Sequence, residues 1–478
     1  MPEEFEKLLL KYEIVFNKHG PPTDLACHKI ECSNEPISLG PFRIAGKNKA
    51  QVSEMLEKIL ENDIIEPCEG PWTFPLIVAP KKNNQIRLCV DFRKLNAITK
   101  SDRYPIPPMY ELLRDVQPGA VLSIIDLQSG FWQVPIAEKD KDKTGFCSPN
   151  GFYQFKRMSF GLKNAPATFQ RLMDNVKKMV PNVQCFAYLD DLIITSPNME
   201  KHLKDLQEIF EVFKKHNLRA NKEKCRFAAE EVHYLGHVIS KEGIKTDKGK
   251  VSAILDIKAP KDVTGVRRIQ QTFAWFRRFV PNMSEILAPI TQLTKKNAKF
   301  VWGPIHQEAM ERIKKLITEA PTLAIPDLNG NFIVTTDASK YAVGAVLAQG
   351  DEKAPRLIEY ASRMLTQAEL NYSTTEKEAL AVIWAFKKFR GYIESSETTV
   401  YTDHQALKWV LRATAPEGRL ARWALALMQF DLRILYLPGN RNAVADLLSR
   451  PEEASVTCLQ WLYFRIATAE KVTRKNIF

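Results

Sequence analysis

The sequence lacks the features that would place the chain in a membrane or in an oxidising compartment. It has eight cysteines among 478 residues, but no CxxC pair and no regular spacing. Cys27, His28 and Cys32 lie close together without a matching downstream pair, so a zinc site is not expected. No apolar run approaches the ~18 residues that span a bilayer, and no signal peptide opens the chain. These absences predict a reduced, intracellular protein with no membrane partner.

Hydrophobic and basic residues, by contrast, are abundant. Hydrophobic residues make up 45% of the chain and aromatic residues 10%, which is enough to build real cores. The length predicts about three structural units of roughly 150 residues each. The formal charge of +12 is compatible with a polyanionic partner. Charge alone does not establish such a partner, because many basic proteins bind no nucleic acid.

Three aspartates stand on strand-like apolar runs. Cys185–Ser196 reads CFAYLDDLIITS, which predicts a hairpin with Asp190 and Asp191 at its tip. An isolated pair of this kind is also typical of a polar turn. A second apolar run, Val121–Leu127, carries Asp126, and a charge on a buried strand is costly unless it is paired or binds metal. If the two segments are neighbours, the carboxylates form a site for two Mg²⁺ ions, which suits in-line phosphoryl displacement.

These segments resemble a known family. YLDD at Tyr188–Asp191 and SIIDLQSGF at Ser123–Phe131 are similar to the palm motifs of reverse transcriptases. RLCVDFRKLN at Arg87–Asn96 and MSFGLKNAPATFQ at Met158–Gln170 resemble those of Gypsy-type (metavirus) LTR retrotransposons. The resemblance runs from about residue 10 to about residue 452. It implies an α+β multidomain fold, in which a right-hand polymerase of fingers, palm and thumb precedes an α/β RNase H-like domain.

The resemblance and the helix and strand patterns together predict the domain boundaries. No Asp-Ser/Thr-Gly protease signature and no integrase-type zinc pattern is present, so a processed or recombinant piece of a polyprotein is expected. The expected parts are 1–105, leader and part of the fingers; 106–139, part of the palm; 140–170, part of the fingers; 171–240, palm with the YLDD hairpin and primer grip; 241–325, thumb and linker; 326–452, RNase H domain; and 453–478, C-terminal tail.

The resemblance also implies the nucleotide contacts. Lys82 and Arg87, on a basic hairpin, are expected to contact the triphosphate, Arg87 through its bidentate fork; Lys82 fits a solvated turn equally well. Phe131 is expected to crowd the sugar 2′ position, where RNA and DNA precursors differ, although an aromatic residue here also fits a plain core. Phe160 stands where retroviral enzymes have glutamine, so it is expected to act by packing alone. Gly161 is expected to allow close backbone approach.

The primer end has its own expected contacts. Tyr188, beside the paired aspartates, is implied to touch the template–primer. His233–Ser240 is predicted to form a β-ribbon. Its counterpart in the family grips the primer, which places Leu235 and Gly236 at the contact.

A thumb helix is predicted over Val263–Val280, with apolar residues at helical spacing and arginines elsewhere. In the family this helix lies against the minor groove, which implies a contact for Arg277. Gln270 and Gln271 replace the family's Leu-Gly pattern. They either bond to minor-groove acceptors or face solvent, and the bulk of Phe273 argues against close approach.

Four further carboxylates follow from about residue 328, in the order strand, helix, strand, helix. Any one of them alone fits a helix cap or a surface charge. Together their order resembles RNase H and implies a second two-metal site that activates water for attack on a phosphodiester. Glu376 competes with Glu378, which is preferred because the family's Glu-x-Leu-Ala pattern falls there. The expected ligands are Asp337, Glu378, Asp403 and Asp446.

The expected activity is RNA- and DNA-templated DNA synthesis combined with degradation of the RNA strand of RNA/DNA hybrids. Each site is expected to take two Mg²⁺, with Mn²⁺ as a substitute. The implied partners are an RNA template, a DNA primer, RNA/DNA hybrid and dNTPs; a tRNA primer, a homodimer and a cytoplasmic location in virus-like particles are compatible with the family. A catalytically silent domesticated scaffold is the alternative, against which the presence of all seven carboxylates argues. A polymerase that prefers DNA templates is the second alternative function.

Overall fold

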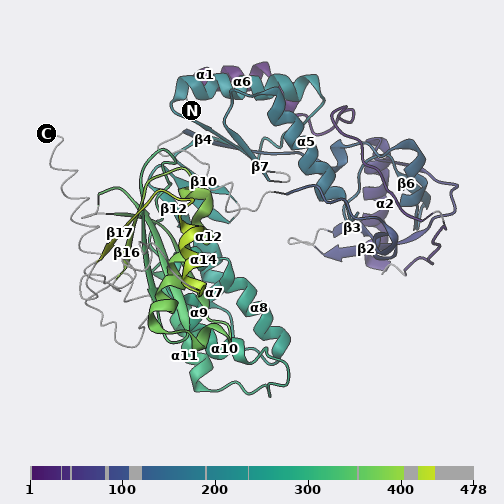
Figure 1. The fold of residues 1–478 in the computed structure, drawn as a ribbon. Helices are drawn as coiled ribbons and strands as arrows, with labels where there is room; N and C mark the ends of the chain where they lie inside the picture. The colour runs from purple at the N-terminus through teal and green to yellow at the C-terminus, as the bar shows by residue number, and fades with distance from the viewer. Residues whose placement is uncertain are drawn as a thin grey trace. The chain divides into compact units, whose positions relative to one another are not determined.

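The protein is described by a computed structural model, shown in Figure 1, in which residues 3–33, 35–42, 46–80, 86–106, 121–188, 191–234, 236–351, 355–402 and 418–436 are placed. The chain divides into two compact units. Unit 1 comprises Met1–Leu112 and Ala120–Tyr234, and unit 2 comprises Leu113–Gly119 and Leu235–Phe478. Both units mix helices with sheets, which confirms the predicted α+β class. Among the placed residues, no helix is both long and apolar enough to cross a membrane.

One sheet of unit 1 corresponds to the predicted fingers. Its strand order is β1-β6-β5-β2-β3. The antiparallel pairing of β2 with β3, in which Leu76 lies opposite Val90, confirms the predicted hairpin, whose turn at 81–85 lies outside the described residues. The strands are β1 (Ile65–Pro67), β2 (Phe74–Pro80), β3 (Ile86–Val90), β5 (Phe146–Ser148) and β6 (Gly151–Phe155).

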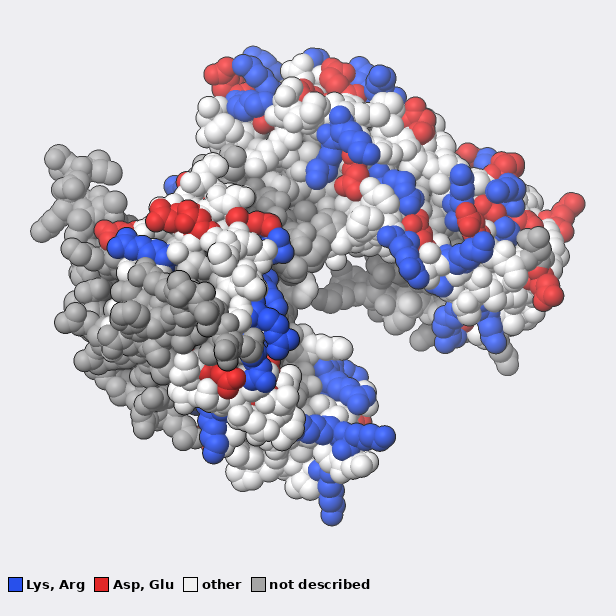
Figure 2. Space-filling view, in the orientation of Figure 1, with Lys and Arg blue, Asp and Glu red and all other residues white. Residues whose placement is uncertain are grey.

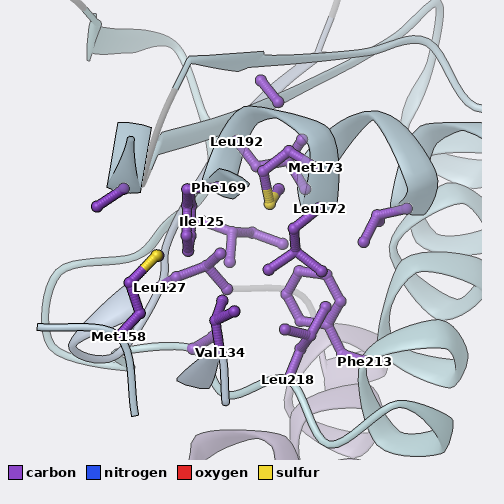
Figure 3. Close-up of a cluster of buried hydrophobic side chains, with 14 of the residues drawn as sticks. Ile125, Leu127, Val134, Met158, Phe169, Leu172, Met173, Leu192, Phe213 and Leu218 are labelled. Atoms are coloured by element: carbon purple, nitrogen blue, oxygen red, sulfur yellow. The ribbon is translucent and has the colours of Figure 1, made fainter. Parts of the chain in front are cut away.

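The second sheet of unit 1 lies in the segments predicted as palm and has the order β7-β8-β4-β9. The central residues of β4 and β8 are largely apolar and are buried on both faces of the sheet. Helices α5 and α6 pack on one face, where the core shown in Figure 3 joins Ile125 and Leu192 of the sheet to Leu172 and Phe213 of the helices. The elements are β4 (Val121–Asp126), β7 (Cys185–Tyr188), β8 (Asp191–Ser196), β9 (Arg226–Ala229), α5 (Ala165–Met179) and α6 (Met199–Lys215).

The remaining elements of unit 1 anchor the two sheets. The amphipathic helix α1 buries Phe5, Leu8 and Leu9. Tyr12 follows it, with its ring 5.7 Å from that of Phe210 in α6. The elements are α1 (Glu3–Lys11), η1 (Glu13–Phe16), α2 (Gly46–Glu61), α3 (Arg93–Ile98), η3 (Gly130–Gln133), η4 (Glu138–Asp140), η5 (Asp142–Thr144) and β10 (Glu231–Tyr234).

In unit 2, β11 (His237–Ser240) and β12 (Gly243–Thr246) form a hairpin, which a group of helices follows. Strand β11 lies in the segment predicted as palm and primer grip, 171–240, and the later elements of this group lie in the segment predicted as thumb and linker, 241–325. The predicted helix Val263–Val280 is shorter than expected, because α8 ends at Ala274 and a 3₁₀ turn, η6, follows. A 3₁₀ turn superimposes side chains three residues apart, and Phe276 and Phe279 are both buried there. The elements are β11 (His237–Ser240), β12 (Gly243–Thr246), α7 (Lys248–Leu255), α8 (Val263–Ala274), η6 (Arg277–Phe279), α9 (Met283–Ile286), α10 (Ala288–Gln292) and α11 (Pro304–Thr318).

The C-terminal sheet of unit 2 has the order β15-β14-β13-β16-β17. As predicted, β13 pairs antiparallel with β14, and it also pairs parallel with β16. Strand β15 is not among the predicted strands, because Glu359, Ser362 and Arg363 interrupt its apolar pattern. The elements are β13 (Phe332–Ala338), β14 (Ala342–Gln349), β15 (Arg356–Met364), η7 (Glu369–Asn371), α12 (Thr374–Ile393), β16 (Thr398–Thr402), α14 (Gly418–Leu427) and β17 (Leu432–Tyr436).

The helices of unit 2 pack directly on this sheet. The Ser284 backbone N–H donates to Ser362 Oγ (3.1 Å), and Ser284 Oγ donates to the Ser362 carbonyl (2.8 Å). Ile244 of β12 forms an isolated bridge with Leu323. The predicted boundary between residues 325 and 326 therefore falls inside one compact unit, and the division into thumb and RNase H domain stays a prediction.

Candidate active sites

Two of the predicted palm aspartates face each other across neighbouring strands. Asp126 is the last residue of β4 and Asp191 the first of β8, and the antiparallel register pairs them directly. Residues opposite each other in such a pair have Cβ atoms about 4.5–5.5 Å apart. The predicted adjacency of the two segments is confirmed, while Asp190 lies outside the described residues.

The electrostatics of this pair favour a cation. Burial, and then the negative charge of Asp126, raise the pKa of the Asp191 carboxyl, while Lys224 opposes that rise. Lys224 Nζ lies 3.2 Å from Asp126 Oδ1 and 3.3 Å from Oδ2. One lysine thus contacts Asp126 and also favours the charged form of Asp191. Hard divalent cations prefer oxygen ligands of this kind, so the residues fit a Mg²⁺ site.

The predicted nucleotide-site aromatics come together beside the palm sheet. The rings of Phe131 and Phe160 lie 5.3 Å apart, and Phe131 also contacts Phe169 at 5.5 Å. Phe131 sits in η3 and is half-buried, whereas Phe160 is 38% exposed. The exposed ring of Phe160 can therefore offer a packing surface, backed by Phe131.

Gly161 adopts a backbone conformation that favours glycine, with φ of +89°. Its carbonyl accepts a hydrogen bond from Asn96 Nδ2 at 2.8 Å, so the turn is tied to α3. Lys82 lies outside the described residues. Arg87 lies in β3 opposite Ala79, and its side chain is outside the described part.

A buried polar network lies on the helix-covered face of the palm sheet. Because side chains alternate along a strand, Ser123 of β4 and Ser196 of β8 point away from the face that carries Asp126 and Asp191. The His202 ring, on α6, connects the two serines: Nε2 is 2.6 Å from Ser123 Oγ, and Nδ1 is 2.8 Å from Ser196 Oγ. The network therefore ties α6 to both carboxylate-bearing strands.

The hydrogen-bond partners determine the tautomer of His202. Ser196 Oγ donates to Asp205 Oδ2 at 2.6 Å, so it accepts from His202 Nδ1–H. Nε2 is then the acceptor for the Ser123 hydroxyl, whose oxygen in turn accepts from the Ala228 backbone N–H. Burial lowers the pKa of His202 to about 4, which keeps this neutral arrangement at physiological pH.

In unit 2, the predicted primer-grip segment packs against the thumb helices. Gly236 has φ of +75°, and a Cβ there would lie 1.7 Å from Lys250 Nζ, so only glycine fits. His237 stacks on Trp275 with ring centroids 5.8 Å apart, and Lys250 Nζ lies 4.3 Å from the centre of the same indole. Leu235 lies outside the described residues, and Tyr188, in unit 1, is half-buried at the end of β7.

The thumb-helix residues divide between core and surface. Phe273 is fully buried, so the expectation that its bulk obstructs close approach is wrong: its ring faces the core. Gln270 donates through Nε2 to Thr291 Oγ1 at 2.8 Å, which turns it toward α10, whereas Gln271 and Arg277 are exposed. Figure 2 shows lysine and arginine side chains gathered over the part of unit 2 that carries α8 and α10.

The second predicted site is described for two of its four carboxylates. Asp337 lies near the end of β13 and Glu378 in the second turn of α12, and both are buried. Helix α12 packs against β13, which brings their elements together. Asp403 and Asp446 lie outside the described residues. Within the described ranges, no group of three or more His, Cys, Asp or Glu is arranged to hold a metal.

The two competing glutamates of α12 have different environments. Glu376 forms the predicted capping box: it accepts from the Ser373 backbone N–H at 2.9 Å and forms an ion pair with Arg419 at 2.9 Å. Glu378, two residues later, is buried. The preference for Glu378 as the metal ligand stays a prediction, and the capping role of Glu376 supports it.

Two candidate functional residues were not identified from the sequence. Lys224 contacts Asp126, which lies 98 residues away in the sequence, and no local sequence pattern predicts such a contact. Trp275 is 38% exposed on a basic surface, and its helical spacing from the buried Phe273 and Phe276 gives a signal, because it falls off the apolar stripe.

Two family models match separate segments of the chain. Residues 79–239 match a family model for reverse transcriptase (RNA-dependent DNA polymerase), and residues 327–430 match one for an RNase H-like domain found in reverse transcriptase. Among solved structures, the foamy viral protease-reverse transcriptase in complex with dsDNA has a TM-score of 0.80 at 22% identity, over 91% of this chain and 94% of that chain. This likeness shows the fold.

Curated relatives are retrotransposon polyproteins. The Pol polyprotein from transposon 297 of Drosophila melanogaster is 38% identical over 87% of this chain and 40% of its own length. The Pol polyprotein from transposon gypsy of Drosophila melanogaster is 35% identical over 87% of this chain and 42% of its own length. Transposon Tf2-3 polyprotein of Schizosaccharomyces pombe is 32% identical, over 85% and 31%. The chain thus spans less than half the length of these relatives, and it belongs to the Gypsy-type retrotransposon reverse transcriptases that carry an RNase H-like domain.

Proposed function

We propose that the chain synthesises DNA on RNA and DNA templates and degrades the RNA strand of the resulting hybrid. The observation that carries the proposal is the direct pairing of Asp126 with Asp191 at the ends of β4 and β8. The raised pKa of Asp191 indicates that the pair concentrates negative charge where a divalent cation would relieve it.

In the polymerase site, Asp126, Asp190 and Asp191 would hold two Mg²⁺ ions, with Mn²⁺ as a substitute. Bound ions of this kind supply charge stabilisation to both the attacking and the leaving oxygens. The protein's own contribution is geometric: β4 and β8 fix the carboxylates in register, and Lys224 partly neutralises them.

Nucleotide selection is assigned to the aromatic pair. Phe160 presents an exposed ring that rests on Phe131, and Phe131 is held from behind by Phe169. A ring supported in this way cannot retreat easily, because packed interiors resist displacement. The Phe131 ring, packed against both Phe160 and Phe169, therefore suits exclusion of a 2′-hydroxyl from an incoming dNTP. Phe160 contributes by packing, and Lys82 and Arg87 would contact the triphosphate.

The nucleic acid itself is expected to contact unit 2. The exposed Arg267, Arg268 and Arg277 lie on or just after α8, and Trp275 adds an aromatic surface next to Lys250. Cations bind phosphates with affinity that falls steeply as salt rises. Tyr188, Leu235 and Gly236 are proposed to hold the primer end.

The RNase H-like site is proposed to hold a second pair of ions between Asp337, Glu378, Asp403 and Asp446. Burial of Asp337 and Glu378 suits metal ligands, because buried carboxylates are normally paired or coordinated. The transposon polyproteins to which the chain is related support a role in element replication. A tRNA primer, a homodimer and a cytoplasmic location in virus-like particles are proposed on the same ground.

The test follows primer extension and hybrid cleavage in the same reaction for wild type, Asp126→Asn and Asp431→Asn. Asp126→Asn should reduce extension at least ~100-fold, the scale of losing one fixed electrostatic stabiliser, with cleavage retained. Asp431→Asn is the matched control, because Asp431 is exposed at the start of β17. Equal loss of both activities in Asp126→Asn would contradict independent sites, and an inactive wild type would favour the silent scaffold.

A further inference from the structure

A small cavity on unit 1 has an unusual excess of positive charge. Its volume is about 50 Å³, and Lys18, His19, Arg157 and Arg219 are among the residues that line it. Of the described residues that line it, none is acidic. Lys18 and His19 are exposed, whereas Arg157 and Arg219 are each only 7% exposed. The cavity thus has exposed basic residues and two buried arginines in its lining.

Arg219 is the most unusual of these cations. Its Nη1 donates to the Leu218 carbonyl at 3.1 Å, but its Nε, although buried, has no hydrogen-bond partner. In the placed part of the chain, Arg219 makes no ion pair. Burial lowers its pKa, yet an arginine stays protonated in proteins. A buried cation without a counter-charge is costly, so an anion in the cavity would stabilise it.

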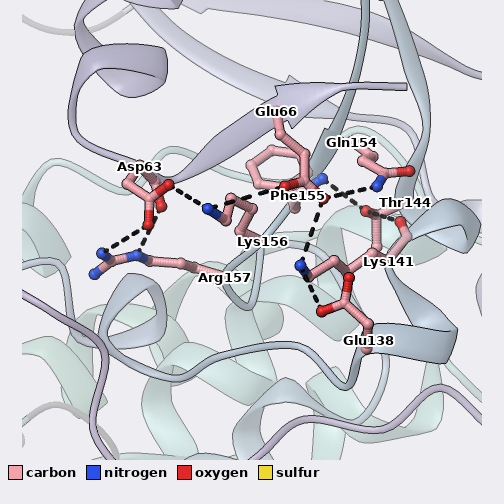
Figure 4. A network of polar contacts seen from close by, with 9 residues as sticks. All are labelled: Asp63, Glu66, Glu138, Lys141, Thr144, Gln154, Phe155, Lys156 and Arg157. Carbon is pink, nitrogen blue, oxygen red and sulfur yellow. Dashed lines mark hydrogen bonds and ion pairs between the residues drawn. The ribbon is translucent and has the colours of Figure 1, made fainter. Parts of the chain in front are cut away.

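The neighbouring groups are arranged around the same space. Arg157 is held by its Nε donating to the Asp63 carbonyl (3.0 Å) and Nη1 donating to the Gly20 carbonyl (3.0 Å); Figure 4 shows Arg157 turned toward Asp63. The Asp63 carboxylate is 3.9 Å from Arg157 Nη2, so Arg157 is partly compensated and Arg219 is not. Trp132 Nε1, also buried, has no hydrogen-bond partner.

Gly20 and Gln133 surround Arg219. A Cβ on Gly20 would lie 2.8 Å from Arg219 Nη2, so the chain at Gly20 passes directly beside the guanidinium. Gln133 fixes the other side, because its Oε1 accepts from the Arg219 backbone N–H and its Nε2 donates to the Arg219 carbonyl, both at 2.8 Å. These two bonds hold the Arg219 backbone, and the bond from Nη1 to the Leu218 carbonyl orients the guanidinium, which reduces the entropic cost of binding.

We propose that this cavity, the Arg219 pocket, is a binding site for a phosphate-type oxyanion. Arg219 and Arg157 supply the charge, Trp132 Nε1 supplies a neutral donor, and Lys18 and His19 lie at the entrance. Planar guanidinium groups recognise phosphate through charge-assisted hydrogen bonds. The oxyanion is either free phosphate or pyrophosphate, or a phosphate group of a bound nucleic acid. The proposal does not depend on catalysis, so it can fail without affecting the proposed function.

The first experiment measures the melting temperature of unliganded wild type, Arg219→Met and Lys214→Gln in chloride and in sodium phosphate at matched ionic strength. Phosphate stabilises most proteins non-specifically, and Lys214→Gln, an exposed lysine of α6, reports that general effect. In chloride, Arg219→Met should melt at or above wild type, because it removes an uncompensated charge. On going from chloride to phosphate, the melting temperatures of wild type and Lys214→Gln should rise more than that of Arg219→Met. Equal phosphate-dependent shifts in all three would overturn the proposal.

A second measurement distinguishes the two sources of the oxyanion. Phosphate, pyrophosphate and an RNA/DNA duplex are titrated separately into wild type and Arg219→Met. No divalent cation and no dNTP is present in these titrations. A site for free oxyanions gives at least about tenfold weaker phosphate or pyrophosphate binding in the variant, with duplex affinity unchanged. A site for a nucleic-acid phosphate gives weaker duplex binding and a salt slope reduced by about one. No change in any titration would exclude the site.

Discussion

At the scale of single residues, two side chains of identical chemistry can have different roles because they occupy different positions in one helix. Glu376 and Glu378 stand two residues apart on α12, yet Glu376 caps the helix and pairs with Arg419, whereas Glu378 is buried. A capping carboxylate is occupied by backbone N–H groups and so contributes mainly to stability. A buried carboxylate on a helix that packs against the Asp337 strand, β13, is instead suited to hold a cation.

This contrast gives a matched pair of variants. Glu378→Gln should reduce hybrid cleavage at least ~100-fold, because it removes a fixed charge from the site, and should leave primer extension intact. Glu376→Gln should retain cleavage within a few-fold and lower the free energy of unfolding by no more than about 1 kcal/mol, because glutamine still completes the capping box and only the partly exposed ion pair with Arg419 is lost. Single-turnover cleavage and urea unfolding measure the two effects. The reverse pattern would transfer the catalytic assignment to Glu376.

At the scale of elements, the palm sheet is held from behind by a hydrogen-bonded network that its own strands cannot supply. His202 joins α6 to Ser123 of β4 and Ser196 of β8, and Lys201 holds Asp205 at 2.6 Å. Every polar atom in the chain of bonds from Ser123 to Lys201 has a partner. Buried networks that are fully satisfied in this way specify one register, and register decides whether Asp126 meets Asp191.

A double-mutant cycle tests that coupling. His202→Ala and Ser123→Ala should each lower the free energy of unfolding, and their interaction energy should be about 0.5–3 kcal/mol, as for residues in one network. His202→Ala combined with Ser53→Ala is the control, because Ser53 donates to Asn150 Oδ1 at an exposed site, outside the network around His202. That pair should be additive within about 0.5 kcal/mol. Additivity of the first pair would show that His202 merely fills space.

The same scale shows what the sequence could and could not predict. The hairpins of the fingers and palm were predictable because alternating apolar residues and turn residues lie within a few positions of each other. The capping box at Ser373 was predictable for the same reason. The shortened α8 and the additional strand β15 were not, because tertiary packing overrides local preference there.

At the scale of the whole molecule, the same limit applies to function. Asp126 and Asp191 were assigned from motifs, but the contact with Lys224, the network around His202 and the Arg219 pocket all join segments that are about 80 to 200 residues apart. Motifs identify groups that react. They do not identify the groups that hold them in place, because those groups have no fixed spacing along the chain.

Buried histidines distributed over both units make the molecule sensitive to acid. Burial lowers the pKa of His28 and of His202 to about 4, and that of His237 to about 3. Each folded-state pKa lies below the ordinary value of about 6.5, so the unfolded chain binds protons more readily in the interval between. The stability contributed by each neutral histidine is therefore present above pH ~6.5 and is lost as the pH falls toward the folded-state pKa.

Between pH 7.5 and pH 5, each of these histidines should cost about 2 kcal/mol of unfolding free energy. Urea unfolding followed by circular dichroism at the two pH values measures the loss. His28→Gln should reduce the pH dependence by roughly the share of one histidine, because glutamine does not titrate, while the exposed His233→Gln should leave it unchanged. If wild type kept its full stability at pH 5, the three histidines would have to accept protons within the fold, and the neutral tautomer of His202 that links β4 to β8 could not be the one that holds the palm sheet.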